Sequence, residues 1–187
     1  MKQVGEGELR VILKWLEQVV SVGVRGDVVE MGCYKGETSI MIGEKLVGTG
    51  KDLWVYDSFE GLPGGGEFVR GELRASVSDV VSRFRKEGLA EPYVVKGWFS
   101  ELTEGDMPRE ICFAFLDGDF YESIADSLRL VAPRMVKGGA IVIHDYRNGK
   151  LPGVRRAVEE FARSNGCNVR EEEGLGILRF SARGVVS

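Results

Sequence analysis

Short apolar runs alternate with longer amphipathic stretches along this chain, and the alternation constrains the fold more than any other feature. The apolar runs, which predict strands, lie at residues 27–31, 52–57, 92–97, 111–117 and 138–145. The stretches with helical spacing of their apolar residues lie at 36–47, 76–86, 120–134 and 153–166. Strands that alternate with helices predict an α/β fold with a parallel sheet, right-handed crossovers and helices on both faces.

The two ends of the chain and one long loop complete this pattern. An amphipathic stretch at residues 8–20 predicts a helix ahead of the first strand. Residues 167–172 and 175–180 predict two closing strands joined as a hairpin. Glycine and proline are frequent in residues 58–71, which predicts a mobile loop without regular structure.

Composition narrows the class of protein. The 187 residues are 43% hydrophobic and 29% charged with a net charge of −4, which argues against a nucleic-acid or anionic-membrane partner. No run approaches the roughly 18 apolar residues of a membrane span, and the N-terminus lacks the apolar stretch of a signal peptide. The distant cysteines Cys33, Cys112 and Cys167 predict neither disulfides nor a metal cluster. We therefore expect a protein of the reducing cytoplasm.

Polar residues end several of the predicted strands. In a parallel sheet, ligands bind at the carboxyl ends of the strands, near the point where the strand order reverses. We expect that edge to gather Glu30, Asp57, Gly97, Asp117, His144 and Asp145.

A glycine turn and a later carboxylate predict a nucleoside cofactor. Residues 30–36 read EMGCYKG, where Gly32 permits a tight turn and Gly36 a close backbone approach beside the free N–H groups of a helix. Tyr34 occupies a position where the dinucleotide fingerprint needs glycine. Asp57, 21 residues after Gly36, can accept both hydroxyls of a ribose. The pattern favours a cofactor without a pyrophosphate, and a turn-capping role for Asp57 is the alternative.

Two carboxylates, Asp117 and Asp145, end buried strands at the same predicted edge. An unpaired carboxylate in that position would be costly. Two such groups can hold Mg²⁺, with water and substrate oxygens completing its coordination. The alternatives are loop capping or an arginine partner such as Arg147 or Arg155.

Two neighbours of these carboxylates allow more than one role. Asp119 and Glu122 have the spacing of a capping box, which favours a structural role for Asp119. His144 is the only histidine of the chain. Three roles are open to it. As a metal ligand it would favour Mn²⁺, Zn²⁺ or Ni²⁺. The other roles are a general base and a structural residue that forms hydrogen bonds.

Aromatic residues lie close to the same edge. Trp98 follows Gly97 and can form an apolar wall for an adenine ring, whereas Phe99 is expected to pack in the core. Tyr121 and Tyr146 either face a substrate or pack on helices.

The order of motifs ExGxxxG, DSFEGLP, KGWF, LDGDFYES and IVIHDY resembles the macrocin O-methyltransferase (TylF-type) family. The resemblance spans about residues 27–161 and points to the class I S-adenosylmethionine-dependent methyltransferases. It implies a Rossmann-like fold with a seven-stranded, mostly parallel sheet, a C-terminal antiparallel hairpin and helices on both faces. It also implies that residues 1–187 form a single methyltransferase domain, in which residues 1–26 supply an N-terminal helix and a shortened lid.

The resemblance also implies where S-adenosyl-L-methionine lies. The methionine part is expected to contact Glu30, Gly32 and Tyr34, with Gly36 beside them at the start of the helix. The ribose is expected to contact Asp57, Ser58 and Phe59. The adenine is expected to contact Gly97 and Trp98. The divalent metal site of the family falls on Asp117, His144 and Asp145, where this chain has His-Asp in place of the usual Asp-Asp. Mg²⁺ is the expected ion and Mn²⁺ the alternative.

These features predict methyl transfer from a sulfonium to a hydroxyl of a sugar, polyol or catechol-like small molecule. The metal would lower the pKa of that hydroxyl, and Asp117 or His144 would accept its proton. We expect no nucleic-acid or membrane partner, and a homodimer is one assembly that the sequence leaves open. The alternatives are an NAD(P)-binding Rossmann oxidoreductase and a cofactor-binding partner protein without catalysis.

Overall fold

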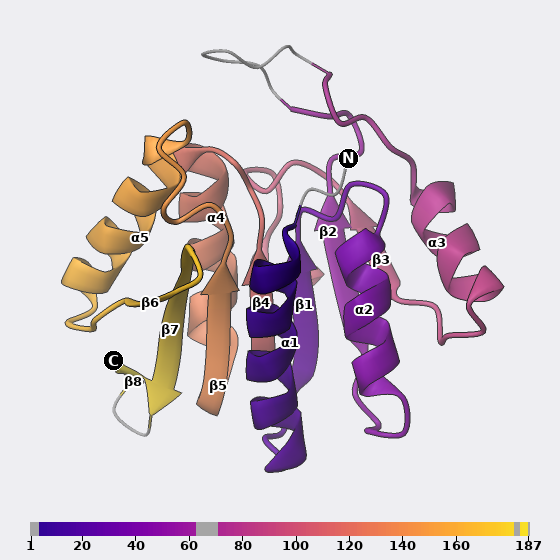
Figure 1. The fold of residues 1–187 in the computed structure, drawn as a ribbon, viewed down its shortest axis with the longest axis horizontal. Coiled ribbons are helices and arrows are strands. Elements are labelled where there is room, and N and C mark those ends of the chain that lie inside the picture. The colour runs from indigo at the N-terminus through magenta and orange to yellow at the C-terminus, as the bar shows by residue number, and fades with distance from the viewer. Residues whose placement is uncertain (1–3, 63–70, 182–183, 187) are drawn as a thin grey trace.

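The computed structural model describes residues 4–62, 71–181 and 184–186. The strands form one sheet that carries helices on both faces (Figure 1). The strands are β1 (Asp27–Met31), β2 (Leu53–Asp57), β3 (Tyr93–Lys96), β4 (Ile111–Leu116), β5 (Met135–Ile143), β6 (Arg170–Glu172), β7 (Leu175–Ser181) and β8 (Gly184–Val186). The helices are α1 (Glu6–Ser21), α2 (Glu37–Leu46), α3 (Val77–Lys86), α4 (Tyr121–Val131) and α5 (Pro152–Ser164), with 3₁₀ turns η1 (Glu104–Asp106) and η2 (Ala132–Arg134).

The sheet confirms the predicted fold class. Its strand order is β3-β2-β1-β4-β5-β7-β6, and β8 also pairs with β7. The pairs among β1 to β5 are parallel, whereas β7 runs antiparallel to both β5 and β6. The result is a Rossmann-like, mostly parallel sheet with a C-terminal antiparallel hairpin, and the short β8 is an addition that the sequence did not predict.

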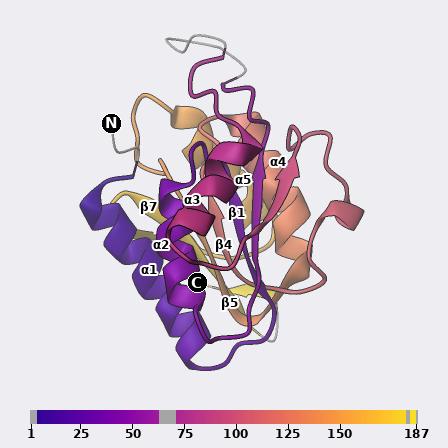
Figure 2. The same ribbon diagram turned by 90° about the vertical axis from the view of Figure 1, so that its right-hand side faces the viewer.

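Alternate residues of the central strands pack on opposite faces of the sheet. In β4, Phe113 and Phe115 join the cluster formed with α1, α2 and α3, whereas Ala114 and Leu116 join the cluster formed with α4 and α5. Figure 2 shows α1 and α2 on one side of the sheet and α4 on the other, and α5 packs beside α4. All residues of β4 are buried, which explains why its sequence is a continuous apolar run.

Two predicted boundaries were wrong for a local reason. The predicted helix at 120–134 ends at Val131, and residues 132–134 form η2 around Pro133, which cannot continue an α-helix. Strand β5 begins at Met135 rather than at residue 138, and its register against β4 shifts there. Gly138, with φ 88°, lies in this irregular part and weakened the strand signal of the sequence.

The predicted loop at 58–71 lies partly outside the described residues, which omit 63–70. Its two described ends meet through backbone hydrogen bonds. The Leu62 N–H donates to the Glu72 carbonyl at 2.7 Å, and the Gly71 N–H donates to the Leu62 carbonyl at 2.9 Å. The mobility of the loop stays a prediction.

Helix α1 packs on the sheet and brings its first turn to the carboxyl edge. Its Ile12 and Leu16 are fully buried. The Trp15 Nε1–H donates to Glu172 Oε2 at 3.2 Å, and the Arg179 guanidinium lies 5.1 Å from the Trp15 ring centroid. These contacts hold α1 against the C-terminal hairpin.

The three cysteines are free thiols, and Cys33 and Cys112 are buried. Among the described residues, no helix combines the length and the apolar character that crossing a bilayer needs.

We expect Phe113→Ala to lower the free energy of unfolding by about 3–5 kcal/mol, because the truncation leaves a cavity in a strand buried on both faces. Urea denaturation followed by circular dichroism measures the change. Val22→Ala is the control, since Val22 is 75% exposed and its truncation should change stability by less than about 0.5 kcal/mol. Equal losses in the two variants would contradict the placement of Phe113 in the core.

Candidate active site

A cavity of about 980 Å³ opens at the carboxyl edge of the parallel strands. Its walls come from the loops that follow β1 to β5 and from the first turn of α1. Strand β1 lies between β2 and β4, where the strand order reverses, which is the usual ligand position in such sheets. The volume lies near the top of the roughly 300–1,000 Å³ range of small-molecule sites. The cavity therefore has room for a nucleoside cofactor together with a small acceptor.

The loop between β1 and α2 depends on glycine at position 32. Gly32 has φ 91°, and its N–H donates to the Tyr56 carbonyl at 2.8 Å. A Cβ at this position would lie 1.9 Å from the Asp117 carbonyl oxygen, far inside contact distance. Tyr34 follows with φ 49°, and Gly36, with φ 79°, is the N-cap of α2. The turn thus packs the predicted cofactor loop against the strand end that carries Asp117.

Asp57 holds this loop in place. Its Oδ2 accepts hydrogen bonds from the Cys33 N–H at 3.0 Å and the Tyr34 N–H at 2.9 Å. Its Oδ1 accepts one from the Phe59 N–H at 2.7 Å. A carboxylate offers about four acceptor positions, so Asp57 keeps one for a ligand. Asp57 therefore caps the turn, which was the alternative role that the sequence allowed. A contact to both hydroxyls of a ribose would have to displace one of these hydrogen bonds.

Glu30 is a buried carboxyl group at the end of β1. It has no exposed surface, and its Oε2 accepts a hydrogen bond from the Ser39 hydroxyl. Its Oε1 has no hydrogen-bond partner among the described residues. Burial raises the pKa of Glu30 to about 8; the Ser39 hydrogen bond lowers it, and the charges of Asp117 and Asp57 raise it. Because Glu30 also lines the cavity, its orphaned oxygen suits a donor group on a ligand.

The loops after β2 and β3 form the wall expected to meet an adenine. The Gly97 N–H donates to the Asp57 carbonyl at 3.0 Å, and Trp98 and Ser58 line the cavity beside it. Phe59 does not line the cavity; it is buried in the core. Phe99 packs on the core as expected and also reaches the cavity.

Among the residues predicted to hold the cofactor, only Gly36 and Phe59 lie outside the cavity wall. The others line it: Glu30, Gly32, Tyr34, Asp57, Ser58, Gly97 and Trp98.

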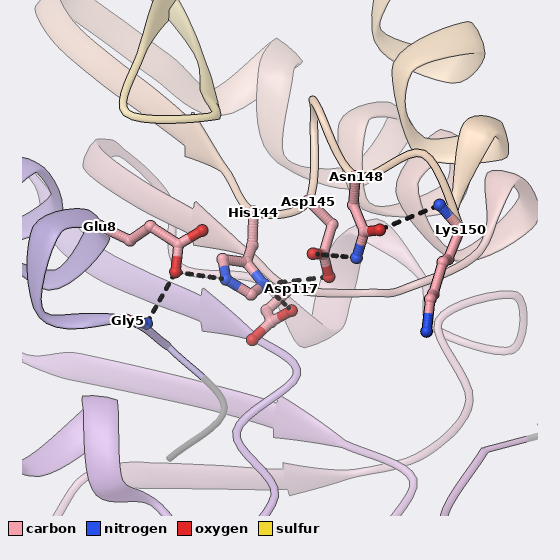
Figure 3. Close-up of polar contacts among 7 residues, drawn as sticks. All are labelled: Gly5, Glu8, Asp117, His144, Asp145, Asn148 and Lys150. Carbon is pink, nitrogen blue, oxygen red and sulfur yellow. Dashed lines mark hydrogen bonds and ion pairs between the residues drawn. The ribbon is translucent and has the colours of Figure 1, made fainter.

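An acid–histidine cluster, made of Asp117, His144 and Asp145, occupies the ends of β4 and β5 (Figure 3). His144 Nδ1 lies 3.0 Å from Asp117 Oδ1 and 3.1 Å from Asp145 Oδ2. His144 is 6% exposed. Burial would lower the pKa of its imidazole, but the carboxylates of Asp117 and Asp145 raise that pKa to about 12. The sequence prediction that these three side chains would converge is consistent with this geometry.

Neither Arg147 nor Arg155 neutralises the cluster. Arg147 Nε lies 3.1 Å from Glu171 Oε2, and Arg155 Nε lies 2.7 Å from Glu159 Oε1. The arginine alternative is therefore wrong for both residues. Loop capping does occur, since the Asn148 Nδ2–H donates to Asp145 Oδ1 at 2.8 Å.

The geometry of the cluster fits a divalent cation. One ligand atom from each of Asp117, His144 and Asp145 lies within 4.8 Å of the others. Neighbouring ligands around an octahedral ion with bonds of about 2.1 Å lie about 3.0 Å apart. The distances from Nδ1 to the two carboxylate oxygens are 3.0 and 3.1 Å, so small adjustments would admit an ion.

The capping role that the sequence predicted for Asp119 is wrong. The expected capping box with Glu122 is not formed, because the N-cap of α4 is Phe120 and no side chain caps it. Asp119 instead adopts φ 58° and lines the cavity. Burial, together with the charges of Asp117 and Asp145, raises its pKa to about 7.

The two tyrosines of this edge pack on helices. The Tyr121 hydroxyl donates to Glu160 Oε2 at 2.6 Å, and the Arg156 guanidinium lies 4.2 Å from the ring. Tyr146 is 7% exposed. Neither lines the cavity, so the substrate-facing alternative is not supported.

Sequence reasoning also missed the part of the wall that comes from the chain's N-terminus and from the loop after β5. Leu9 from α1 and Asn148 and Lys150 from the loop line the cavity. Glu8 does not line the cavity, but its Oε2 lies 3.4 Å from His144 Nε2. No local motif marks these residues, because Glu8 and Leu9 reach the edge only through the packing of α1 on the sheet, and Asn148 and Lys150 only through the course of the loop between β5 and α5.

The family model of the macrocin-O-methyltransferases (TylF) matches residues 1–172 of this chain. The chain belongs to this family. It is 32% identical, over 87% of its length, to the 8-demethyl-8-(2,3-dimethoxy-alpha-L-rhamnosyl)-tetracenomycin-C 4'-O-methyltransferase of Streptomyces olivaceus. It is 29% identical, over 84% of its length, to the demethyldecarbamoylnovobiocin O-methyltransferase of Streptomyces niveus. These matches cover 69% and 66% of the two relatives.

A solved structure agrees with this assignment. The O-methyltransferase NovP matches with a TM-score of 0.82 and 25% identity, over 95% of this chain and 81% of that one. The chain is thus an S-adenosylmethionine-dependent O-methyltransferase with a Rossmann-like fold, as the motifs predicted.

We expect Gly32→Ala to abolish cofactor binding and to destabilise the fold strongly, because a Cβ would strike the Asp117 carbonyl. Gly48→Ala is the matched control: Gly48 also has a positive φ, 77°, but open space around it. The control should cost only the about 1–2 kcal/mol of a left-handed L-residue. Thermal denaturation and calorimetry with S-adenosylmethionine measure both effects. If the two variants behaved alike, the close approach of the two loops would be wrong.

We expect Glu30→Gln to remove a pH dependence of stability. The folded chain keeps the Glu30 proton up to a pKa of about 8, against a usual value of 4.5, so its contribution to stability is full below the lower value and is lost as pH rises through 8. Between these values wild type should lose up to about 1 kcal/mol per pH unit relative to the variant. Urea denaturation without cofactor measures it, with the exposed Glu101→Gln as control. Parallel stability curves for wild type and Glu30→Gln would refute the expectation.

Proposed function

We propose that this enzyme methylates a hydroxyl of a sugar or of a sugar-bearing small molecule, with a divalent metal held by Asp117, His144 and Asp145. The observation that carries the proposal is the position of this cluster at the same cavity as Glu30 and Asp57. Glu30, Asp57 and Trp98 form the cofactor side of the cavity, and the acid–histidine cluster forms its acid side. The two sides meet where Gly32 packs against the Asp117 backbone.

The cofactor side offers one feature to each part of S-adenosylmethionine. The orphaned Oε1 of Glu30 suits the amino group of the methionine part. The remaining acceptor position of Asp57 suits one ribose hydroxyl. Trp98 offers an apolar wall to the adenine. These assignments place the sulfonium between the two sides of the cavity.

The acid side would orient and deprotonate the acceptor. Bound S-adenosylmethionine would supply the methyl group to the hydroxyl oxygen, with S-adenosylhomocysteine as the leaving group. A divalent metal bound to the cluster would lower the pKa of the acceptor hydroxyl. Asp117 and His144 then serve as ligands, since Nδ1 and the carboxylates already face one another. We assign the proton to Asp119, which lines the cavity and has no hydrogen-bond partner among the described residues.

The printed activities of the relatives support a sugar acceptor. One relative is named for a 4'-O-methylation of a rhamnosyl tetracenomycin. Another is named as a mycinamicin III 3''-O-methyltransferase, and it is 28% identical over 88% of this chain. Polyol and catechol acceptors remain alternatives that suit the same cluster. Cytoplasmic location and a homodimer stay predictions from the sequence.

The nicotinamide alternative is set aside, because the chain belongs to a methyltransferase family and Tyr34 interrupts the dinucleotide fingerprint. The non-catalytic alternative differs from the proposal in one respect: it predicts cofactor binding without turnover on any acceptor.

Calorimetry with S-adenosylmethionine, and separately with Mn²⁺ or Mg²⁺ before and after EDTA, tests the proposal on wild type and Asp117→Asn. We expect the variant to bind the cofactor like wild type, to bind the metal at least about tenfold more weakly, and to lose methyl transfer to a panel of glycosides. Asp126→Asn is the matched control, since Asp126 pairs with Arg129 on the surface of α4.

Each outcome has a clear meaning. Cofactor binding and turnover that survive EDTA would overturn the metal and leave the methyltransferase. Cofactor binding with no turnover on glycosides, polyols or catechols would favour the non-catalytic alternative. Methyl transfer that is equal in Asp117→Asn and Asp126→Asn would remove the cluster from the reaction.

A further inference from the structure

A line of polar contacts connects the N-terminal helix to the acid–histidine cluster (Figure 3). Glu8, the third residue of α1, accepts a hydrogen bond from the Gly5 N–H at 2.7 Å through Oε2. The same oxygen lies 3.4 Å from His144 Nε2. Glu8 is thus shared between the start of its own helix and the histidine of the site, although about 135 residues separate them in the chain.

The two ring nitrogens of His144 have different surroundings. Nδ1 faces Asp117 and Asp145 at hydrogen-bonding distance. Nε2 is buried, and the described residues give it no hydrogen bond of good geometry. The Glu8 carboxylate at 3.4 Å is the ionic contact that the structure gives to Nε2 among those residues. The environment of Nε2 therefore depends on α1.

An ionised carboxylate only accepts hydrogen bonds, so it favours N–H at the ring nitrogen that it faces. Glu8 therefore favours N–H at Nε2, and Asp117 and Asp145 favour N–H at Nδ1 while no cation is bound. A cation held by the cluster would replace the hydrogen on Nδ1, whereas Nε2 would keep its hydrogen toward Glu8. Metal-binding histidines in proteins commonly have such an outer carboxylate, which fixes the ring orientation and the tautomer.

We propose that Glu8 is a positioning residue that holds the Nε2–H side of His144, so that Nδ1 faces the pair of carboxylates. This inference rests on the proposed function, because Nδ1 has a use as a ligand only if the cluster holds a cation. It goes beyond that function by giving α1 a part in the chemistry, in addition to its part in the wall of the cavity.

The packing of α1 fixes the position of the Glu8 carboxylate relative to His144. The helix is anchored by buried Ile12 and Leu16 and by the Trp15 hydrogen bond to Glu172. The Gly5 N–H fixes the carboxylate itself. A side chain held at two points loses little further freedom when it contacts the imidazole.

The competing explanation is that Glu8 only caps its helix. Asp79 provides a matched control, because it is the third residue of α3 and accepts from the Ser76 N–H at 2.8 Å, as Glu8 accepts from Gly5. Asp79 does not line the cavity. Loss of either carboxylate removes the same kind of cap, but only Glu8 touches the histidine.

The single histidine of the chain makes the test direct, since long-range ¹H–¹⁵N spectra of histidine-labelled protein show only the two ring nitrogens of His144. We compare wild type, Glu8→Ala, Glu8→Gln and Asp79→Ala, and titrate each with Mn²⁺ followed by electron paramagnetic resonance. In metal-free wild type we expect Nε2 to carry a hydrogen toward Glu8, as Nδ1 does toward its two carboxylates. Glu8→Ala should shift both nitrogen resonances and weaken Mn²⁺ binding about 10- to 100-fold. Asp79→Ala should change neither.

Glu8→Gln keeps an acceptor for Gly5 and covers the case in which Glu8→Ala does not fold; its Nε2 resonance should also move, because the charge is gone. Unchanged nitrogen resonances in both Glu8 variants would overturn the inference, as would equal effects from Asp79→Ala. If wild type binds no Mn²⁺, the metal part of the proposed function fails, and the nitrogen resonances still decide the role of Glu8.

Discussion

The close approach of two backbone segments is the constraint on which the site depends. A Cβ atom on residue 32 would lie 1.9 Å from the Asp117 carbonyl oxygen, so only glycine fits at this position. The Asp117 N–H in turn donates to the Met31 carbonyl at 2.8 Å. The ends of β1 and β4 are therefore locked together at the point where the strand order reverses. Because one end carries the cofactor loop and the other carries the acid–histidine cluster, this contact sets the separation between cofactor and acceptor.

Negative charge is concentrated at this edge, and it explains which ligands the cavity suits. Nine of the described residues that line the cavity carry carboxyl groups, and five of these lie at or just after the ends of β1, β2, β4 and β5: Glu30, Asp57, Asp117, Asp119 and Asp145. Burial and mutual repulsion raise the pKa of Glu30 and Asp119. A sulfonium, an ammonium group and a divalent ion each relieve part of that repulsion. The burial of so much acid, which is costly in the free protein, thus favours cationic ligands over neutral or anionic ones.

The sequence predicted the fold well because its signals are local and repeated. The run that became β4 is apolar throughout and buried on both faces, and the runs that became β1 and β2 are mostly apolar. The convergence of Asp117, His144 and Asp145 also followed from strand ends alone. Asp119 was assigned wrongly because the capping-box spacing with Glu122 ignores the left-handed backbone that turns it to the cavity. Glu8 could not be found, since only the docking of α1 brings it to His144.

Backbone strain gathers at the same edge and distinguishes one residue from the others. Tyr34, Phe59, Asp119 and Asp145 all have positive φ without being glycine, and such conformations cost about 1–3 kcal/mol each. Asp57 accepts from the N–H groups of Tyr34 and Phe59, and Asn148 donates to the Asp145 side chain. Those three residues are held by contacts within the protein. Asp119 has no comparable hydrogen bond from its side chain among the described residues, so its carboxylate keeps its acceptor positions open toward the cavity. Its pKa of about 7 means that the ionised form is available near neutral pH and holds a proton more firmly than an ordinary aspartate does. In the proposed mechanism this half-buried carboxylate is therefore suited to take the proton of a bound hydroxyl.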